Sequence, residues 1–154
     1  MKKTILVVDD FASIRDFVCE TLQWIGFETL GAANGNEAMD VVYAEHPDLV
    51  IIEILMPTMD GFEFVQALRS QPTLAATQVI FYTATYTVEE AKTLADACGV
   101  EYVLAKPAKL QQILDTVNAA LGISPVALDP ALALLPSGPS TAAPLGRLGD
   151  KLVS

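Results

Sequence analysis

The sequence predicts an α/β fold, a doubly wound parallel sheet of five strands with five helices. Short, continuous apolar runs alternate along residues 1–122 with segments whose apolar residues recur at helical spacing. Continuous apolar runs are typical of strands that are buried on both faces, as they are in a parallel sheet. Repeated strand-then-helix units place helices on both faces of such a sheet, because crossover connections between parallel strands are right-handed.

The first half of this region contains three predicted strands and two predicted helices. Residues 5–8 form an unbroken apolar run, and residues 11–25 carry apolar side chains at helical spacing, namely Ile14, Val18, Leu22 and Ile25. Residues 28–32 read as a second strand. The turn signal Asn34-Gly35 precedes a second helix over residues 37–45, and Pro47 closes the connection to a third strand at 49–53.

The second half repeats the same alternation. A helix over 62–70 is followed by a strand at 79–82, and a helix over 88–97 ends at Gly99, which we expect to adopt a left-handed cap. Residues 102–105 form the fifth strand. The fifth helix ends at Gly122 and is marked by apolar residues at helical spacing: Leu110, Ile113, Leu114, Val117 and Leu121.

The composition changes after Gly122, which sets the predicted domain at residues 1–122 and a linker or tail at 123–154. This segment is punctuated by prolines and is rich in Ala, Leu, Ser and Gly. Near its end, Leu145, Leu148 and Leu152 have the spacing of an amphipathic helix that has just begun. We therefore expect the chain to be the amino-terminal part of a longer signalling protein, with a frayed tail as the alternative.

Charge and hydropathy exclude several classes of function. The formal net charge is −10, from 19 acidic and 9 basic residues, which argues against binding to nucleic acid or to an anionic membrane. No apolar stretch reaches the length of about 18 residues that a membrane span requires. The start of the chain lacks the layout of a signal peptide. We expect a cytoplasmic protein whose two cysteines, Cys19 and Cys98, are free thiols.

Polar residues follow four of the predicted strands. Strand one ends in Asp9-Asp10, strand three in Glu53, strand four in Thr83 and strand five in Lys106. The carboxyl ends of parallel strands meet at one edge, where open α/β sheets bind ligands. Two carboxylates about 4 Å apart repel by roughly 4 kcal/mol at an effective dielectric constant near 20. Lys106 and a hard divalent cation with oxygen ligands are the natural partners for these carboxylates.

With these residues at its strand ends, the sequence resembles the receiver domains of response regulators over residues 1 to 122. The matching segments are Val7-Val8-Asp9-Asp10, Met56-Pro57 with Asp60-Gly61, Thr83-Ala84 and Lys106-Pro107. The resemblance implies a flavodoxin-like strand order of 2-1-3-4-5. It also implies Mg²⁺ as the cofactor, bound by Asp9, Asp10, the residue at position 53 and the carbonyl of Leu55. Thr83 and Lys106 would contact the phosphoryl group of a phosphorylated acidic residue at position 53.

The sequence departs from the family at that acceptor position, where Glu53 stands in place of aspartate. The carboxylate of glutamate reaches about 1.5 Å further from the backbone, and a misplacement of that size costs phosphoryl transfer about 100-fold. The longer side chain also brings negative charge closer to Thr83 and Lys106. The sequence leaves two interpretations open: Glu53 imitates the phosphorylated state, or it pairs with Lys106 and leaves the receiver inert.

A second departure concerns strand five. Family members often carry an aromatic residue three positions before the lysine, and here that residue is Val103. Tyr102 lies one position earlier, so the alternation of a strand predicts that it points to the opposite face.

The resemblance also implies partners. We expect a sensor histidine kinase or a phosphotransfer protein as the partner, and a downstream domain in a longer chain. We expect the face of the fourth helix, fifth strand and fifth helix to form the contact surface, including that of a homodimer. We expect a signalling module and not an enzyme. The alternatives are a phosphorylation-independent interaction module and, in a different class, a magnesium-dependent phosphatase. Phosphatases of the haloacid dehalogenase type carry the motif Asp-x-Asp on their first strand, whereas Asp9 and Asp10 are adjacent in this sequence.

Overall fold

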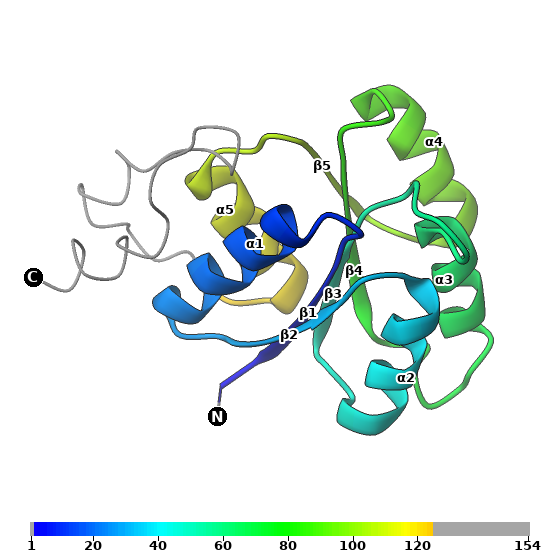
Figure 1. Ribbon diagram of the computed structural model, residues 1–154, viewed down its shortest axis with the longest axis horizontal. Helices are drawn as coiled ribbons and strands as arrows, with labels where there is room; N and C mark the ends of the chain where they lie inside the picture. Colours follow the sequence, from blue (N-terminus) through cyan, green and yellow to red (C-terminus); the bar gives the residue numbers. More distant parts are fainter. Residues whose placement is uncertain (1, 125–154) are drawn as a thin grey trace, which may run out of the picture.

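Five parallel strands form the central layer of the computed structural model, which describes residues 2–124 (Figure 1). The strands, in chain order, are β1 (Thr4–Val8), β2 (Glu28–Ala32), β3 (Leu49–Ile52), β4 (Gln78–Thr83) and β5 (Tyr102–Ala105). Their spatial order is β2-β1-β3-β4-β5, and every neighbouring pair is parallel. Both the predicted doubly wound α/β fold and the implied strand order are confirmed.

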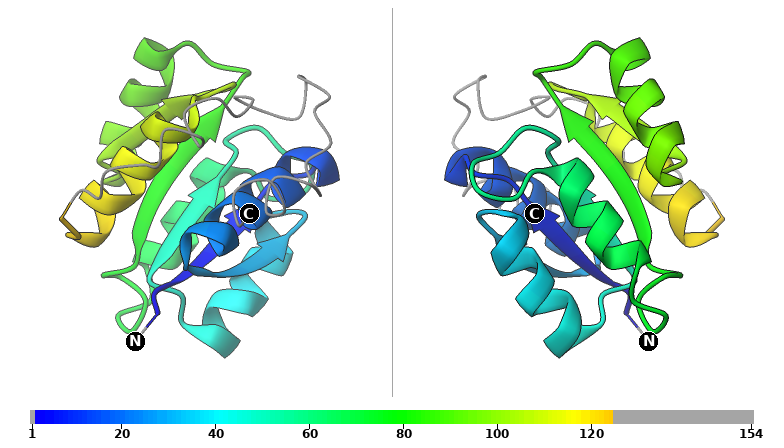
Figure 2. Two further views of the ribbon diagram at one scale, coloured as in Figure 1. Left: turned by 90° about the vertical axis from the view of Figure 1, so that its left-hand side faces the viewer. Right: turned by 90° about the vertical axis from the view of Figure 1, so that its right-hand side faces the viewer.

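Helices cover both faces of this sheet. One face carries α1 (Ala12–Ile25) and α5 (Leu110–Leu121), and the other carries α2 (Gly35–Glu45), α3 (Gly61–Arg69) and α4 (Val88–Cys98) (Figures 1 and 2). Local sequence sets several of the helix ends. Asp60 caps α3 by accepting a hydrogen bond from the backbone N–H of Glu63 at 2.8 Å. Gly99 and Gly122 end α4 and α5 in the left-handed conformation, with φ of 76° and 69°.

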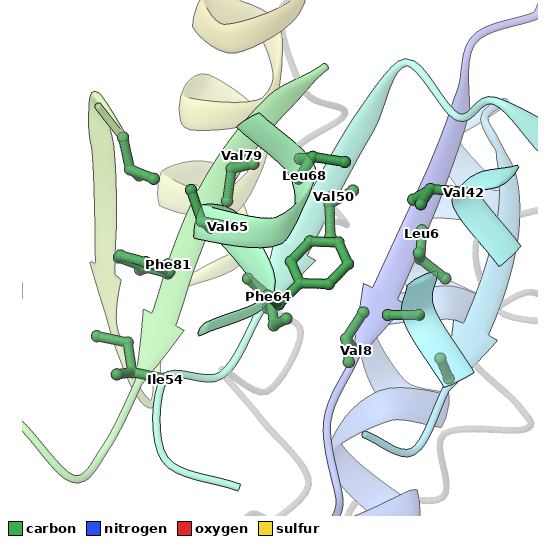
Figure 3. Packing of buried hydrophobic residues seen from close by; sticks show 14 of the residues in the cluster. Leu6, Val8, Val42, Val50, Ile54, Phe64, Val65, Leu68, Val79 and Phe81 are labelled. Carbon is green, nitrogen blue, oxygen red and sulfur yellow. The ribbon is translucent and has the colours of Figure 1, made fainter. Parts of the chain in front are cut away.

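The alternation of side chains along the strands divides the core into two layers. Leu6, Val8, Val50, Val79 and Phe81 point toward α2, α3 and α4, where they pack with Phe64 and Leu68 (Figure 3). Their strand neighbours point toward α1 and α5 and form a second cluster, whose strand members are Ile5, Val7, Leu49, Ile51, Ile80, Tyr82 and Leu104. Because both layers are buried, a shift of one residue in strand register would exchange their side chains, so the positions at which the strands end are well defined.

Tyr102 and Val103 follow this alternation. Tyr102 packs against the layer beneath α1 and α5, whereas Val103 packs against the layer beneath α2, α3 and α4. The prediction that Tyr102 faces away from the position of Val103 is therefore confirmed.

The predicted boundaries differ from the observed ones by at most two residues, and those of β2 and β5 coincide with them. Glu53 follows β3 instead of ending it, Phe11 precedes α1 as its N-cap residue, and α2 begins at Gly35. Gly99 and Gly122 end their helices as predicted. The predicted linker lies outside the described residues from residue 125 onward, and with it the spacing of Leu145, Leu148 and Leu152. Over residues 2–124, no helix has the length and apolarity that crossing a bilayer requires.

A glycine fixes the segment that follows β3. The N–H of Gly61 donates a hydrogen bond to the carbonyl of Ile54 at 2.7 Å. A Cβ atom at position 61 would lie 2.5 Å from the backbone carbonyl oxygen of Glu53. Only glycine permits this close approach, which brings the start of α3 against the backbone of Glu53.

Candidate functional site

The ammonium of Lys106 lies between two carboxylates at the carboxyl edge of the sheet. Its Nζ atom is 2.6 Å from Asp9 Oδ2 and 2.8 Å from Glu53 Oε1. The exposed fractions of the three side chains are 7% for Lys106, 3% for Asp9 and 6% for Glu53. We call Asp9, Glu53 and Lys106 the buried ion cluster.

Strand pairing brings these three residues together. Val8 and Ile52 are paired across β1 and β3, and the next backbone N–H, that of Glu53, donates to the carbonyl of Val8 at 3.1 Å. On the other side, the N–H of Lys106 donates to the carbonyl of Thr83 at 2.9 Å. The ladders thus continue one step past β1, β3 and β5, which places Asp9 beside Glu53 and Lys106 next to the end of β4 at Thr83.

Both carboxylate oxygens of Glu53 have partners. Oε1 accepts from Lys106, and Oε2 accepts from the backbone N–H of Ile54 at 2.7 Å. Thr83 is 1% exposed, and its Oγ1 accepts from the N–H of Thr85 at 3.2 Å. Within residues 2–124, no hydrogen bond links Glu53 to Thr83. The longer side chain is therefore turned toward Lys106 and folded back on its own backbone.

Asp9 is held from two further directions. Its Oδ1 accepts a hydrogen bond from the N–H of Phe11 at 3.0 Å, and its backbone carbonyl accepts from Arg15 Nη1 at 2.6 Å. The side chain of Arg15 lies over β2, where a Cβ at Gly31 would come within 3.3 Å of its Cδ. These contacts fix the turn between β1 and α1, and with it the direction of the Asp9 carboxylate.

Burial and charge pairing act against each other in the buried ion cluster. Burial raises the pKa of Asp9 above its ordinary value, more than the hydrogen bond from Lys106 lowers it. Burial on its own would lower the pKa of Lys106, but the hydrogen bonds and charges of Asp9 and Glu53 outweigh it and raise that pKa. The ammonium of Lys106 therefore keeps its charge at neutral pH.

This pairing predicts a loss of stability at alkaline pH. Because the folded-state pKa of Lys106 is raised above 10.5, its contribution is fully present below that pH and is lost as pH rises through the folded-state pKa. Burial also raises the pKa of Tyr82 above 10.0, and the ionisation of its phenol adds to the loss in the same direction. Urea unfolding over this pH range should show a steeper loss for the parent chain than for Lys106→Met. Equal slopes would contradict the pairing.

Two of the four magnesium ligands implied by the resemblance, Asp9 and Glu53, belong to the buried ion cluster. Asp10 and Leu55 are both exposed, and within residues 2–124 no three acidic, histidine or cysteine side chains are arranged to hold a metal ion. The donor atoms are oxygens, which suit Mg²⁺. Two of these oxygens, Asp9 Oδ2 and Glu53 Oε1, already accept hydrogen bonds from the Lys106 ammonium.

The structure therefore unites some of the predicted site residues. Asp9, Glu53 and Lys106 meet directly, and Thr83 lies beside them through its backbone contact with Lys106. Sequence reasoning missed Arg15 and Tyr82, which contact Asp9 and Lys106 respectively. A signal was present for Tyr82, since a residue with a hydroxyl group interrupts an apolar run directly before Thr83.

Comparison with known proteins agrees with the resemblance to receiver domains. The family described as the response regulator receiver domain matches residues 5–118. A probable transcriptional regulator, ycf27, of Cyanophora paradoxa is 46% identical over 70 residues, which are 46% of this chain and 29% of that protein. The response regulator MprA of Mycolicibacterium vanbaalenii is 34% identical over 121 residues, 79% of this chain and 51% of its own length. The chain thus spans about half the length, or less, of the curated relatives it matches.

Solved structures are similar over the same region. The chemotaxis protein CheY4 of Vibrio cholerae superposes with a TM-score of 0.73 at 36% identity, covering 79% of this chain and all of that one. The signal receiver domain of a signal transduction histidine kinase from Syntrophus aciditrophicus gives a TM-score of 0.71 at 28% identity, covering 82% and 98%.

Proposed function

Because the chain belongs to the response-regulator receiver family, we propose that it is a receiver module of two-component signalling that Glu53 holds in one state without phosphoryl transfer. One observation carries this proposal: both carboxylate oxygens of Glu53 are engaged, one by Lys106 and the other by the N–H of Ile54. A carboxylate that is held in this way, with its side chain 6% exposed, presents no free oxygen to a phosphodonor. In-line transfer depends on placing that oxygen correctly.

The direction of Glu53 favours an unswitched receiver over an imitation of the phosphorylated one. An imitation requires negative charge at the Thr83 hydroxyl, whereas that oxygen is bonded to the N–H of Thr85 and the charge of Glu53 is directed to Lys106. A single carboxylate also brings one negative charge where a phosphoryl group brings nearly two. The proposed function is therefore an interaction module that works independently of phosphorylation.

Magnesium belongs to this proposal as a weak ligand. Receiver domains of this family generally bind Mg²⁺ at this site, where the ion neutralises clustered carboxylates and phosphoryl oxygens. In this chain, Asp9, Asp10, Glu53 and the carbonyl of Leu55 would hold it. Lys106 competes for the same oxygens of Asp9 and Glu53, and its ammonium repels a second cation. We therefore propose that the ion is bound more weakly than in a receiver with aspartate at position 53.

The proposed partners follow from the relatives. Both ycf27 and MprA are named as regulators, the first of transcription, and each is longer than this chain. We propose that residues 1–122 act as a receiver domain joined to a further domain, with 123–154 as the connecting segment. We propose two further kinds of partner. One is a sensor histidine kinase or a phosphotransfer protein, and the other is a second receiver that binds to the face of α4, β5 and α5. Val88 at the start of α4 is 40% exposed and available to such a contact.

A phosphate analogue tests the proposal. Adding beryllium fluoride and Mg²⁺ to the isotope-labelled chain should leave the amide NMR signals of the β4–α4 connection and of β5 unchanged. The same addition to Glu53→Asp should shift them, because the shorter carboxylate frees the position that the analogue occupies. Shifts of equal size in both proteins would contradict a phosphorylation-independent module.

A further inference from the structure

The aromatic ring of Tyr82 contacts Lys106, the cationic member of the buried ion cluster. Tyr82 lies on β4 directly before Thr83, is 4% exposed, and points toward the layer under α1 and α5. The ammonium of Lys106 is 5.5 Å from the centroid of its ring. Within residues 2–124, this is the only lysine ammonium that lies over an aromatic ring.

The hydroxyl group of Tyr82 makes a second contact with the same segment. Its oxygen accepts a hydrogen bond from the backbone N–H of Ala108 at 3.2 Å. Ala108 is two residues after Lys106 and is itself 2% exposed. The ring therefore contacts the end of the lysine side chain, while the hydroxyl group holds the backbone that carries this side chain.

Both contacts act on the position of the ammonium. The face of an aromatic ring attracts a cation, and this attraction is strongest where water is excluded, as it is around Lys106. A lysine side chain is a flexible chain of four carbons, and it loses considerable conformational freedom when its ammonium is fixed. Asp9 and Glu53 bind the ammonium from the side of the sheet edge, and Tyr82 limits how far it can withdraw from them.

We propose that Tyr82 is a positioning residue that holds the Lys106 ammonium between Asp9 and Glu53. This inference rests on the proposed function, because it is the Lys106–Glu53 contact that withholds Glu53 from phosphoryl transfer. A tyrosine serves this purpose better than phenylalanine or leucine, since it combines the ring face with an acceptor for the Ala108 N–H, which would otherwise be buried without a partner.

Tyr102 provides a matched control. It packs against the same layer and donates its hydroxyl group to the carbonyl of Ala119 at 3.4 Å, on α5. Its ring is not under the ammonium of Lys106. Replacing Tyr102 with leucine therefore removes an aromatic ring and a hydroxyl contact from the same side of the sheet, but leaves the contacts of Lys106 in place.

Hydrogen exchange of the Lys106 ammonium, measured by ¹H–¹⁵N NMR at low temperature, tests the proposal. The parent chain should show a slowly exchanging ammonium signal. Tyr82→Leu should speed its exchange about tenfold through loss of the ring contact. Tyr82→Phe should keep the ring but speed exchange of the Ala108 amide and of the ammonium by about threefold or more, through loss of the hydroxyl contact. Tyr102→Leu should leave both rates unchanged.

The outcomes separate this inference from the proposed function. A slow signal in the parent that Tyr82→Leu leaves unchanged would overturn the role of Tyr82 alone. Equal acceleration by Tyr102→Leu would do the same, because it would show general loosening of the layer. If Tyr82→Leu does not fold, Tyr82→Phe decides, and unchanged exchange rates in that variant overturn the proposal. A freely exchanging ammonium in the parent overturns both the positioning role and the proposed function.

Discussion

Replacing Lys106 with methionine should lower the free energy of unfolding by about 3–5 kcal/mol, because it leaves two buried carboxylates without their shared cation. Asp9 and Glu53 are 2% and 5% exposed, so water cannot readily replace the ammonium. Methionine has nearly the same length as lysine, which keeps the packing against Tyr82 and isolates the loss of charge. Urea unfolding at neutral pH measures the difference.

Lys92 on α4 is the control for this experiment. It is exposed, and within the described part of the chain it has no ion pair. Lys92→Met should therefore change stability by less than about 0.5 kcal/mol. Adding Asp9→Asn to Lys106→Met should restore part of the lost stability, since it removes one of the two stranded charges. A loss of less than about 1 kcal/mol for Lys106→Met would show that the buried ion cluster contributes no more than an exposed pair.

Glu53→Asp should raise the rate of labelling by a small phosphodonor such as acetyl phosphate by about 100-fold in the presence of Mg²⁺. The aspartate side chain is one C–C bond shorter, so we expect its carboxylate to lie about 1.5 Å nearer to the backbone, where the family carries its phosphoryl acceptor. Intact-mass spectrometry before and after incubation follows the added phosphoryl group.

Glu53→Gln is the control for labelling, because an amide supplies no carboxylate nucleophile and should remain unlabelled. Comparison with Glu53→Asp then assigns any label to position 53. Labelling of the parent chain as fast as Glu53→Asp would show that the extra methylene does not displace the reacting oxygen.

The meeting of Asp9, Glu53 and Lys106 was predictable from sequence. Buried parallel strands are recognised by continuous apolar runs, and the residue after each run lies at the same edge of the sheet. What the sequence left open was the direction of Glu53. That direction depends on a side-chain conformation and on the nearby N–H of Ile54, and neither leaves a pattern in the sequence.

The contacts of three supporting residues were also beyond sequence reasoning, although Gly61 lies in a matching segment and Tyr82 interrupts an apolar run. Arg15 reaches the carbonyl of Asp9, Tyr82 reaches both Lys106 and Ala108, and Gly61 packs against the backbone of Glu53. Each acts through a contact between elements that are distant in the chain. A helical arginine, a strand tyrosine or a glycine at a helix start has an ordinary structural explanation until those contacts are known.

The contact between Lys106 and Glu53 can be measured in solution as a scalar coupling between Lys106 Nζ and the carboxyl carbon of Glu53, transmitted through the hydrogen bond to Glu53 Oε1. Such a coupling reports one specific contact in solution without any substitution. We expect couplings from Nζ to the carboxyl carbons of both Asp9 and Glu53, in accordance with the distances of 2.6 Å and 2.8 Å. A coupling to Asp9 alone would mean that Glu53 points away from Lys106. That result would contradict the proposal that Lys106 withholds Glu53 from phosphoryl transfer.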